Sequence, residues 1–462
     1  MLTPPGPVMG WGVDNDGVVR LAAMQDENSL SYETQVMYRE DEESEWTEID
    51  RFEGLQNGWG LMGFTENNEK LYVTSNLGQD TYSVNLFDPQ TGEMEDVFAN
   101  EGTDVNYLGF TPTGEPVTII YNDIDTKPQR HYINNKWKNL IEGFKQAIGV
   151  DYVGISSMSE YGEKMILSIN SDINPGEYYL YDSNKNNIVY LGSTRPWIDP
   201  KTMSKMKPIT YEARDGETIY AFLTIPIDSD GKDLPLIINP HGGPFGIQDQ
   251  WRFNPETQFF ANQGYAVMQI NFRGSGGYGK RFERIGYKRW GLEMQDDISD
   301  GVQWAIDQGI ADAEKIGIYG GSFGGYSAAM APMLRPDLYK SSVAYIGVFD
   351  LEMLYNEGDI KTIKWGGKYL DKTLGQDPEK IKEMSPVHQA HKLQAPMIIV
   401  SGKEDQRAPI EHAYALADAL EEAGKEHELI IVPKEGHGFR KPENRLMLYK
   451  KMLEHFNRTV LK

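Results

Sequence analysis

Hydrophobic and polar positions follow two different rhythms along the chain. Up to about residue 195, short segments such as 70–75 and 177–181 alternate apolar and polar side chains, and turns rich in Asn, Asp and Gly separate them. Further on, continuous apolar runs such as 236–238 and 397–400 alternate with helical stretches. Alternation predicts strands with one exposed face, whereas continuous runs predict strands buried in a parallel sheet. We therefore expect an all-β domain over 1–195 and an α/β domain over 196–462, joined by a Pro- and Met-rich linker.

A weak repeat lies within the first of these domains. Segments that begin at Gly63, Gly109 and Ser157 resemble one another and recur every 46 to 48 residues. This period is close to that of a four-stranded propeller blade, and the domain has room for about four blades. It predicts a partial, propeller-like domain. A pair of immunoglobulin-like sandwiches produces a similar strand spacing and remains the alternative.

A strand-turn-helix motif in the second domain carries the clearest chemistry. The predicted strand at 315–319 runs into Gly320-Gly-Ser322-Phe-Gly324, and an apolar helical stretch follows. In this G-x-S-x-G elbow the serine occupies a strained turn, and small residues are needed where the strand and the helix approach each other. The motif predicts an α/β-hydrolase domain with a mostly parallel, doubly wound sheet and with Ser322 as its nucleophile.

A serine hydroxyl needs a general base and an acid that orients the base, and this fold places the acid before the base in the chain. Asp405 follows the strand at 397–400, and His437 follows the strand at 429–432 with a glycine on each side. We expect Asp405 and His437 to complete a triad. Asp350, which also follows a strand, is the alternative acid.

The developing oxyanion needs hydrogen-bond donors, and two are predicted. One is the backbone N–H of Phe323, directly after the nucleophile. The other is Gly242, in the Gly-rich loop at 239–246. Residues 274–279 also match the dinucleotide pattern G-x-G-x-x-G, but the acids that follow lie at a predicted helix entry and not at a strand end. We therefore expect no cofactor, and no motif indicates a metal.

Composition excludes several classes of function. The formal net charge of -24 disfavours binding to nucleic acid and to anionic membranes. There is no cysteine, so thiolate nucleophiles and disulfides are excluded. The opening segment lacks the pattern of a secretory signal, and no apolar run is long enough for a membrane span. A cytoplasmic protein is expected.

Several motifs in order resemble the prolyl oligopeptidase family of serine peptidases, most closely its acylaminoacyl-peptidase-like branch. They begin at His241, Asn271, Trp290, Gly320, Asp405 and Gly436. The resemblance covers about 196–462 and implies a propeller that restricts entry to short peptides. It also implies that Arg407 binds the carbonyl of the substrate residue before the scissile one and that His241 belongs to the substrate site. The family usually has seven or eight blades, and the smaller number expected here leaves strand edges that favour self-association.

The predicted function is hydrolysis of short or N-acylated peptides through an acyl-enzyme. A carboxylesterase is an open alternative because the same triad cleaves esters. A non-catalytic scaffold would require a broken triad, which the sequence does not show. A dipeptidyl peptidase is less favoured because the paired glutamates that hold a free amino terminus are not identified.

Overall fold

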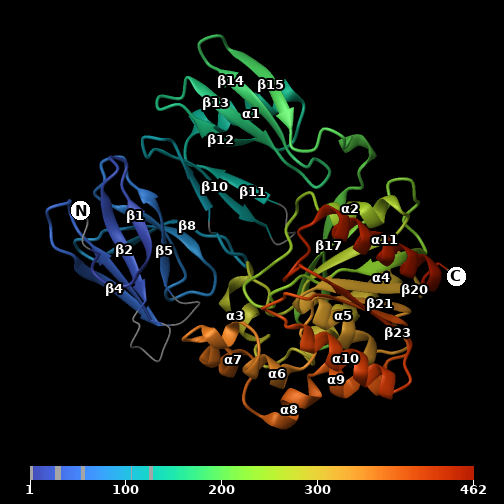
Figure 1. The fold of residues 1–462 in the computed structure, drawn as a ribbon. Helices are drawn as coiled ribbons and strands as arrows, with labels where there is room; N and C mark the ends of the chain where they lie inside the picture. Colours follow the sequence, from blue (N-terminus) through green and yellow to red (C-terminus); the bar gives the residue numbers. More distant parts are fainter. Residues whose placement is uncertain (1–3, 26–32, 54–57, 106, 124–127, 462) are drawn as a thin grey trace. The chain divides into compact units, whose positions relative to one another are not determined.

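The computed structural model describes residues 4–25, 33–53, 58–105, 107–123 and 128–461. The first three residues of the opening segment, for which no secretory signal was expected, lie outside these ranges. The chain forms two compact units (Figure 1). One comprises Met1–Pro200 with Gly277–Lys280, and the other comprises Lys201–Gly276 with Arg281–Lys462.

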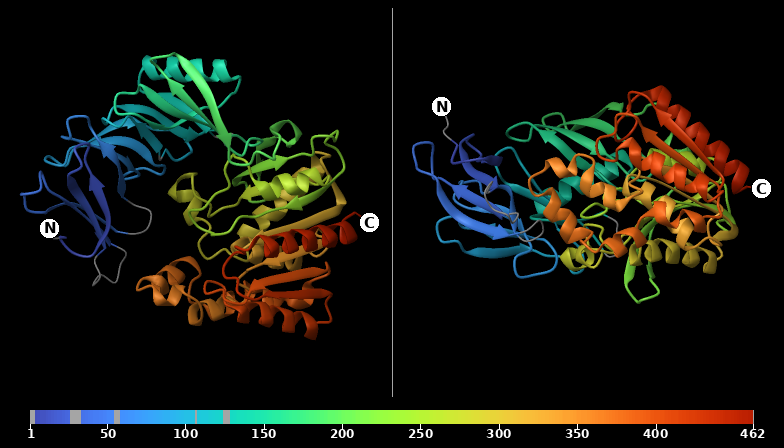
Figure 2. Two further views of the ribbon diagram at one scale, coloured as in Figure 1. Left: turned by 45° about the horizontal axis from the view of Figure 1, so that its top comes forward. Right: turned by 60° about the horizontal axis from the view of Figure 1, so that its bottom comes forward.

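Within the described residues, the first unit contains four antiparallel sheets in chain order, each a simple meander of neighbouring strands (Figure 2). The strands are β1 (Val8–Val13), β2 (Val19–Gln25), β3 (Glu33–Tyr38) and β4 (Thr47–Glu53), then β5 (Trp59–Phe64), β6 (Leu71–Ser75), β7 (Ser83–Phe87) and β8 (Met94–Phe98), then β9 (Tyr107–Phe110), β10 (Pro116–Asn122) and β11 (Pro128–Tyr132), and finally β12 (Gly154–Met158), β13 (Lys164–Ile169), β14 (Glu177–Asp182) and β15 (Asn187–Ser193). This organisation confirms the predicted propeller-like fold with about four blades.

Apolar side chains pack between consecutive sheets of this unit. One cluster joins the first and second sheets, a second joins the second and third, and a third joins the third and fourth; they include Val36 with Leu71, Val84 with Ile119, and Val117 with Leu167. The alternating pattern predicts one buried face for each strand. In the second sheet, however, Leu71 and Val73 of β6 belong to the first cluster and Tyr72 packs against the second, so both faces of this strand contribute. Burial of these faces stabilises the stack of sheets.

A helix interrupts the expected all-β pattern. α1 (Asn135–Ile148) follows the three-stranded third sheet and buries Trp137, Ile141 and Phe144. Asn134 caps its first turn by accepting a hydrogen bond from Trp137 N, and Gly149 ends it in the left-handed conformation. The prediction of an all-β half is wrong for this segment, although its apolar residues are spaced by four and three, as on one face of a helix.

The second unit is built on one eight-stranded sheet. Its order is β16-β17-β19-β18-β20-β21-β22-β23. β17 runs in the opposite direction to the other seven strands. The strands are β16 (Met206–Glu212), β17 (Thr218–Thr224), β18 (Leu234–Ile238), β19 (Ala266–Asn271), β20 (Ala311–Gly321), β21 (Ser341–Tyr345), β22 (Met397–Gly402) and β23 (His427–Val432). Because most strands are parallel, their carboxyl ends meet at one edge, where ligand-binding loops gather.

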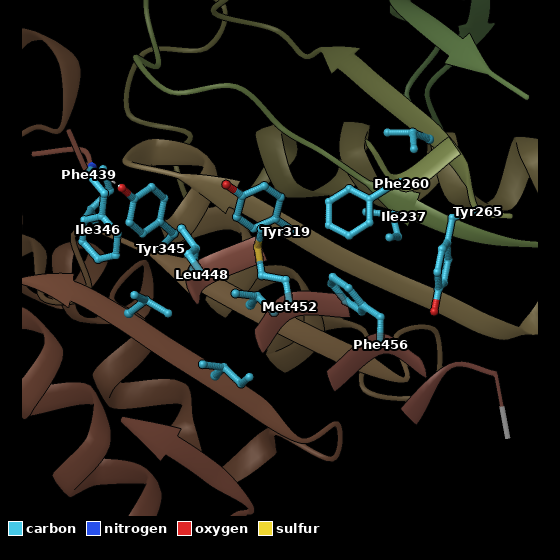
Figure 3. Close-up of a cluster of buried hydrophobic side chains, with 14 of the residues drawn as sticks. Ile237, Phe260, Tyr265, Tyr319, Tyr345, Ile346, Phe439, Leu448, Met452 and Phe456 are labelled. Carbon is cyan, nitrogen blue, oxygen red and sulfur yellow. Dashed lines mark hydrogen bonds between the residues drawn. The ribbon is translucent and has the colours of Figure 1, made fainter. Parts of the chain in front are cut away.

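Helices cover both faces of this sheet. The helices that follow residue 200 are α2 (Pro255–Asn262), α3 (Gly279–Arg284), α4 (Glu293–Asp307), α5 (Phe323–Leu334), α6 (Leu351–Asn356), α7 (Gly366–Thr373), α8 (Pro378–Glu383), α9 (Pro386–Gln389), α10 (Ile410–Glu422) and α11 (Pro442–Thr459), with short 3-10 turns at Pro200–Thr202, Ile360–Thr362 and Ala390–Lys392. On one face, Phe260 of α2 and Met452 and Phe456 of α11 pack against Tyr319 and Tyr345 of the strands (Figure 3). The predicted α/β-hydrolase fold class is confirmed.

Candidate active site

Ser322 lies in the sharp turn between β20 and α5. Its backbone has φ 59° and ψ -119°, a conformation that residues other than glycine rarely adopt. The turn is held from two sides, because Ser322 N donates to Tyr345 O at 3.0 Å and Ser322 O accepts from Tyr326 N at 2.9 Å. The strained serine is thereby fixed at the carboxyl edge of the sheet, as the elbow motif predicts.

Glycines around the serine are required by close backbone approach. A Cβ atom on Gly324 would lie 2.1 Å from Pro240 O, and one on Gly325 would lie 2.3 Å from Tyr345 O. A Cβ atom on Gly320 would lie 2.6 Å from the backbone of Gly324. Both glycines of the G-x-S-x-G motif therefore let α5 press against the strand end and the neighbouring loop.

The structure brings the three predicted triad residues together. His437 Nε2 lies 3.0 Å from Ser322 Oγ, and His437 Nδ1 lies 2.9 Å from Asp405 Oδ2. The Asp405 side chain is fully buried, whereas that of His437 is 30% exposed. Since the carboxylate accepts from Nδ1–H, the lone pair of Nε2 faces the serine hydroxyl. The imidazole is thus oriented to accept the proton of Ser322.

Asp405 is itself held by its own loop. Its Oδ1 accepts hydrogen bonds from Arg407 N and Ala408 N, both at 2.9 Å, which leaves Oδ2 for the imidazole. The alternative acid, Asp350, has a different role: its Oδ1 accepts from Glu352 N and Met353 N and caps α6. The structure therefore brings Asp405, and not Asp350, to His437.

Two residues, Glu435 and Tyr345, hold the loop that carries His437. The buried carboxylate of Glu435 accepts hydrogen bonds from Arg440 N, Lys441 N and Asn444 Nδ2, which holds the loop against the start of α11. These donors, Arg440 N first, hold the pKa of Glu435 below its usual range.

On the other side of His437, Tyr345 Oη accepts from Phe439 N at 2.6 Å, and the two rings meet edge to face (Figure 3). Tyr345 therefore holds the nucleophile turn through its carbonyl and the base loop through its hydroxyl. The sequence analysis missed both residues. Tyr345 lies 94 positions before Phe439, and a contact over this separation leaves no local signal. Glu435 lies within nine positions of its partners, but its sequence neighbourhood matches no motif that was recognised.

The two predicted oxyanion donors lie beside Ser322. Phe323 is the first residue of α5, directly after Ser322. A Cβ atom on Gly242 would lie 3.4 Å from Ser322 Cβ and 4.0 Å from its Oγ. The Gly242 loop thus passes next to the serine side chain.

His241 holds this loop. Its Nδ1 lies 2.7 Å from Gly242 O, its Nε2 lies 2.9 Å from Ser275 Oγ, and its ring stacks on Phe272. Burial lowers the pKa of His241 to about 4, so its ring is neutral at physiological pH. Both ring nitrogens have partners within the protein, and direct contact between His241 and substrate stays a prediction.

The comparisons with known proteins agree with this geometry. Residues 251–462 match the prolyl oligopeptidase family model. This part of the chain belongs to the prolyl oligopeptidase family. Among characterised relatives, dipeptidyl aminopeptidase BIII of Pseudoxanthomonas mexicana is 29% identical over 83% of the chain and 57% of its own length. An acylamino-acid-releasing enzyme of Arabidopsis thaliana is 28% identical over 46% of the chain and 29% of its own length.

The fold extends the likeness to the propeller-like unit. A puromycin-hydrolysing peptidase of Mycobacterium tuberculosis matches 98% of the chain and 70% of its own length with a TM-score of 0.78, at 18% sequence identity. At this identity the likeness establishes the fold alone. The chain spans 57% and 62% of the length of two relatives that it matches along most of its own length.

Two motifs shared with prolyl oligopeptidases have structural roles here. Arg273 forms a buried ion pair with Asp297, with Nε 2.8 Å from Oδ2 and Nη2 2.7 Å from Oδ1, and its Nη1 reaches Asp215 at 2.7 Å. Burial raises the pKa of Asp297 to about 6 even though Arg273 opposes the shift. In the segment that matched the dinucleotide pattern, a Cβ atom on Gly276 would lie 2.5 Å from Gly246 O. The Gly276 segment therefore packs closely against the end of the Gly242 loop at Gly246, and Gly246 N also donates to Gly274 O at 3.2 Å.

The predicted substrate arginine, Arg407, lies in the loop of Asp405, to which its backbone N–H donates at 2.9 Å. Its guanidinium is paired with Asp359, a residue that the sequence analysis did not single out. Within the described residues, no cluster of three or more potential metal ligands is found, and no helix is long and apolar enough to cross a membrane.

Proposed function

We propose that this protein is a serine peptidase that cleaves short or N-acylated peptides through an acyl-enzyme. Membership of the prolyl oligopeptidase family supports the reaction class. The observation that carries the proposal is the continuous hydrogen-bonded chain from Ser322 Oγ through the His437 imidazole to Asp405, with distances of 3.0 and 2.9 Å. These are within the range for proton transfer between a nucleophile and its base.

The first half of the proposed reaction forms the acyl-enzyme. Ser322 Oγ attacks the scissile carbonyl carbon while His437 Nε2 takes its proton. The backbone N–H groups of Phe323 and Gly242 stabilise the oxyanion of the tetrahedral intermediate. His437 then donates the proton to the leaving amine, the C–N bond breaks, and the acyl group remains on Ser322.

The second half releases the acid product. A water molecule gives a proton to His437 Nε2 and attacks the acyl carbon. As the resulting tetrahedral intermediate collapses and the ester bond breaks, His437 Nε2 returns this proton to Ser322 Oγ. Asp405 stabilises the imidazolium in both halves and fixes its tautomer. Arg407 binds the carbonyl that precedes the scissile residue, as its position beside Asp405 allows.

Substrate class separates this proposal from its alternatives. Relatives are named both as acylamino-acid-releasing enzymes and as dipeptidyl aminopeptidases. One preparation should therefore be assayed on an N-acetylated amino-acid anilide, a dipeptidyl anilide with a free amino terminus and a short-chain p-nitrophenyl ester. We expect the highest kcat/KM on the acetylated anilide. A preference for the free dipeptide or for the ester would replace the proposed substrate class by the corresponding alternative.

The nucleophile is tested separately by covalent labelling with a fluorophosphonate. Ser322→Ala should abolish labelling. Ser327→Ala is the matched control, because Ser327 Oγ lies on the same helix but accepts from Gln295 Nε2 at 3.1 Å instead of contacting His437. Undiminished labelling of Ser322→Ala would contradict the assignment.

Two further predictions from the sequence belong to this proposal. They are a cytoplasmic location and self-association through unpaired strand edges of the first unit. Fractionation of the native cells measures the location, and light scattering of the purified chain measures the mass of the assembly.

A further inference from the structure

A carboxylate already binds the Arg407 guanidinium in this structure. Arg407 Nε lies 2.5 Å from Asp359 Oδ1, and Nη2 lies 3.0 Å from Oδ2. A guanidinium carries five N–H groups, and this two-point contact uses one on Nε and one on Nη2. Across the ranges that the structure describes, the two N–H groups of Nη1 have no recorded protein acceptor. Arg407 therefore retains donors for a further oxygen atom while it is paired with Asp359.

Backbone contacts hold Asp359 in this position. Asp359 N donates to Gln406 O at 2.8 Å, and Asp359 O accepts from Thr362 N at 3.0 Å and Thr362 Oγ1 at 2.6 Å. Gly358 has φ +82°, and a Cβ atom there would lie 3.1 Å from Arg407 O. The segment before Asp359 is thus fitted against the loop of the catalytic acid. The backbone on the Asp359 side of the ion pair is therefore fixed, and this holds the carboxylate close to Arg407.

Pairing changes the kind of ligand that Arg407 attracts. The two side chains are 47% and 36% exposed, so a ligand can reach the pair. A guanidinium without a counter-ion binds carboxylates strongly through charge and paired hydrogen bonds. The Asp359 carboxylate cancels this charge and would lie close to an incoming anion, which it repels. A neutral carbonyl oxygen needs a single N–H donor and experiences no such repulsion.

We propose that Asp359 is a specificity-determining residue that makes the Arg407 subsite select uncharged carbonyl groups and reject carboxylates. The inference rests on the proposed function, because it concerns the acyl group or residue that precedes the scissile residue. Favoured substrates carry an acetyl group or a peptide carbonyl there. Disfavoured substrates carry a succinyl group or an acidic side chain. Asp359 acts through Arg407 and takes no part in bond making.

A matched pair of substrates tests the proposal. N-acetyl and N-succinyl derivatives of one amino-acid anilide differ by a terminal carboxylate, and the measured quantity is the ratio of their kcat/KM values. In Asp359→Asn this ratio should shift toward the succinyl substrate by about tenfold, because the repelling charge is removed. Asp359→Glu, which restores the charge, should keep the ratio of the wild type.

Glu426→Gln is the control for a general loss of negative charge. Glu426 also pairs with an arginine, Arg458, at 3.1 Å, and both side chains are more than half exposed. It precedes β23, at the amino end of the strands, whereas Asp405 and Arg407 follow the carboxyl end of β22. For Glu426→Gln, the ratio of the kcat/KM values on the acetyl and succinyl substrates should equal that of the wild type. An Asp359→Asn ratio within about twofold of the wild type and of Glu426→Gln would overturn the proposal.

Failure of the proposed function gives a different result. In that case the wild type would cleave neither anilide, although Ser322 could still react with a fluorophosphonate. The charge preference is then measured as protection of Ser322 from labelling by N-acetyl and N-succinyl amino acids. Asp359→Asn should be protected by the succinyl compound at about tenfold lower concentration than the wild type. Equal protection of both proteins would overturn the role of Asp359.

Discussion

Replacing Tyr345 by phenylalanine tests how the fold positions His437, the proposed catalytic base. Tyr345 Oη accepts from Phe439 N at 2.6 Å, and the two residues are only 9% and 7% exposed. The variant leaves this N–H without an acceptor in the interior, which costs about 1–3 kcal/mol. The Tyr345 carbonyl that holds Ser322 N is unchanged.

Activity should fall as well, because Phe439 is two residues beyond His437. The unsatisfied N–H can reach water only if the loop moves, and this moves the imidazole away from Ser322. A displacement of about 1 Å at a reacting group lowers the rate on the order of 100-fold. We expect kcat of Tyr345→Phe to fall by about tenfold to 100-fold, with little change in KM, because the substrate subsites are not altered.

Tyr265→Phe is the matched control. Tyr265 belongs to the same buried cluster but lies at the opposite end from Tyr345 in Figure 3, and its hydroxyl donates to Asn457 Oδ1 at 2.8 Å. The control should lose stability and keep its kcat. Urea unfolding at pH 7 and steady-state turnover of the acetylated anilide measure both quantities. If Tyr345→Phe loses stability but retains kcat within about twofold, the hydroxyl does not position His437.

Three further predictions concern the same machinery. Asp405→Asn should lower kcat by about 10⁴-fold because an amide imposes the wrong tautomer on the imidazole, whereas the helix-capping variant Asp350→Asn should change kcat by less than about twofold, as steady-state kinetics would show. Gly324→Ala places a methyl group 2.1 Å from Pro240 O and should prevent the elbow from folding, with loss of the unfolding transition seen by circular dichroism. Glu435→Gln should lower stability at pH 7, because the folded state lowers the pKa of Glu435; this contribution is present above the ordinary glutamate pKa and disappears as the pH falls through the lowered value. Urea midpoints of the variant and the wild type should therefore converge at acid pH, and a constant difference would contradict the explanation.

The fold class could be predicted from sequence because its signals are local. Alternation with a period of two shows which strand faces are buried, and continuous apolar runs indicate a parallel sheet. The recurrence every 46 to 48 residues corresponds to the four antiparallel sheets that the structure contains. Local reasoning failed at α1, whose buried residues Trp137, Ile141 and Phe144 lie within the part of the chain that was expected to be all β. The spacing of these apolar residues by four and three is typical of one helix face, but the strand patterns on both sides of the segment favoured an all-β interpretation.

Candidate triad residues could also be proposed from the sequence, since each follows a predicted strand and two are flanked by glycines. The choice between Asp350 and Asp405 could not be made in this way. Both aspartates follow strands, and only the tertiary structure shows that one caps a helix while the other reaches His437 at 2.9 Å. Sequence reasoning assigns residue types to strand ends, whereas hydrogen-bond partners depend on how the strand ends meet.

By itself, the sequence determined the two-part organisation, the elbow and the kinds of side chain that follow the strands. Only the tertiary structure decided that Tyr345 joins the nucleophile turn to the base loop and that Asp359 pairs with Arg407, 48 positions away. The physical reason is the range of the interactions. Backbone propensity and hydrophobic period act over a few residues, but a hydrogen bond or ion pair requires two distant segments to approach within about 3 Å, which the packing of the whole sheet determines.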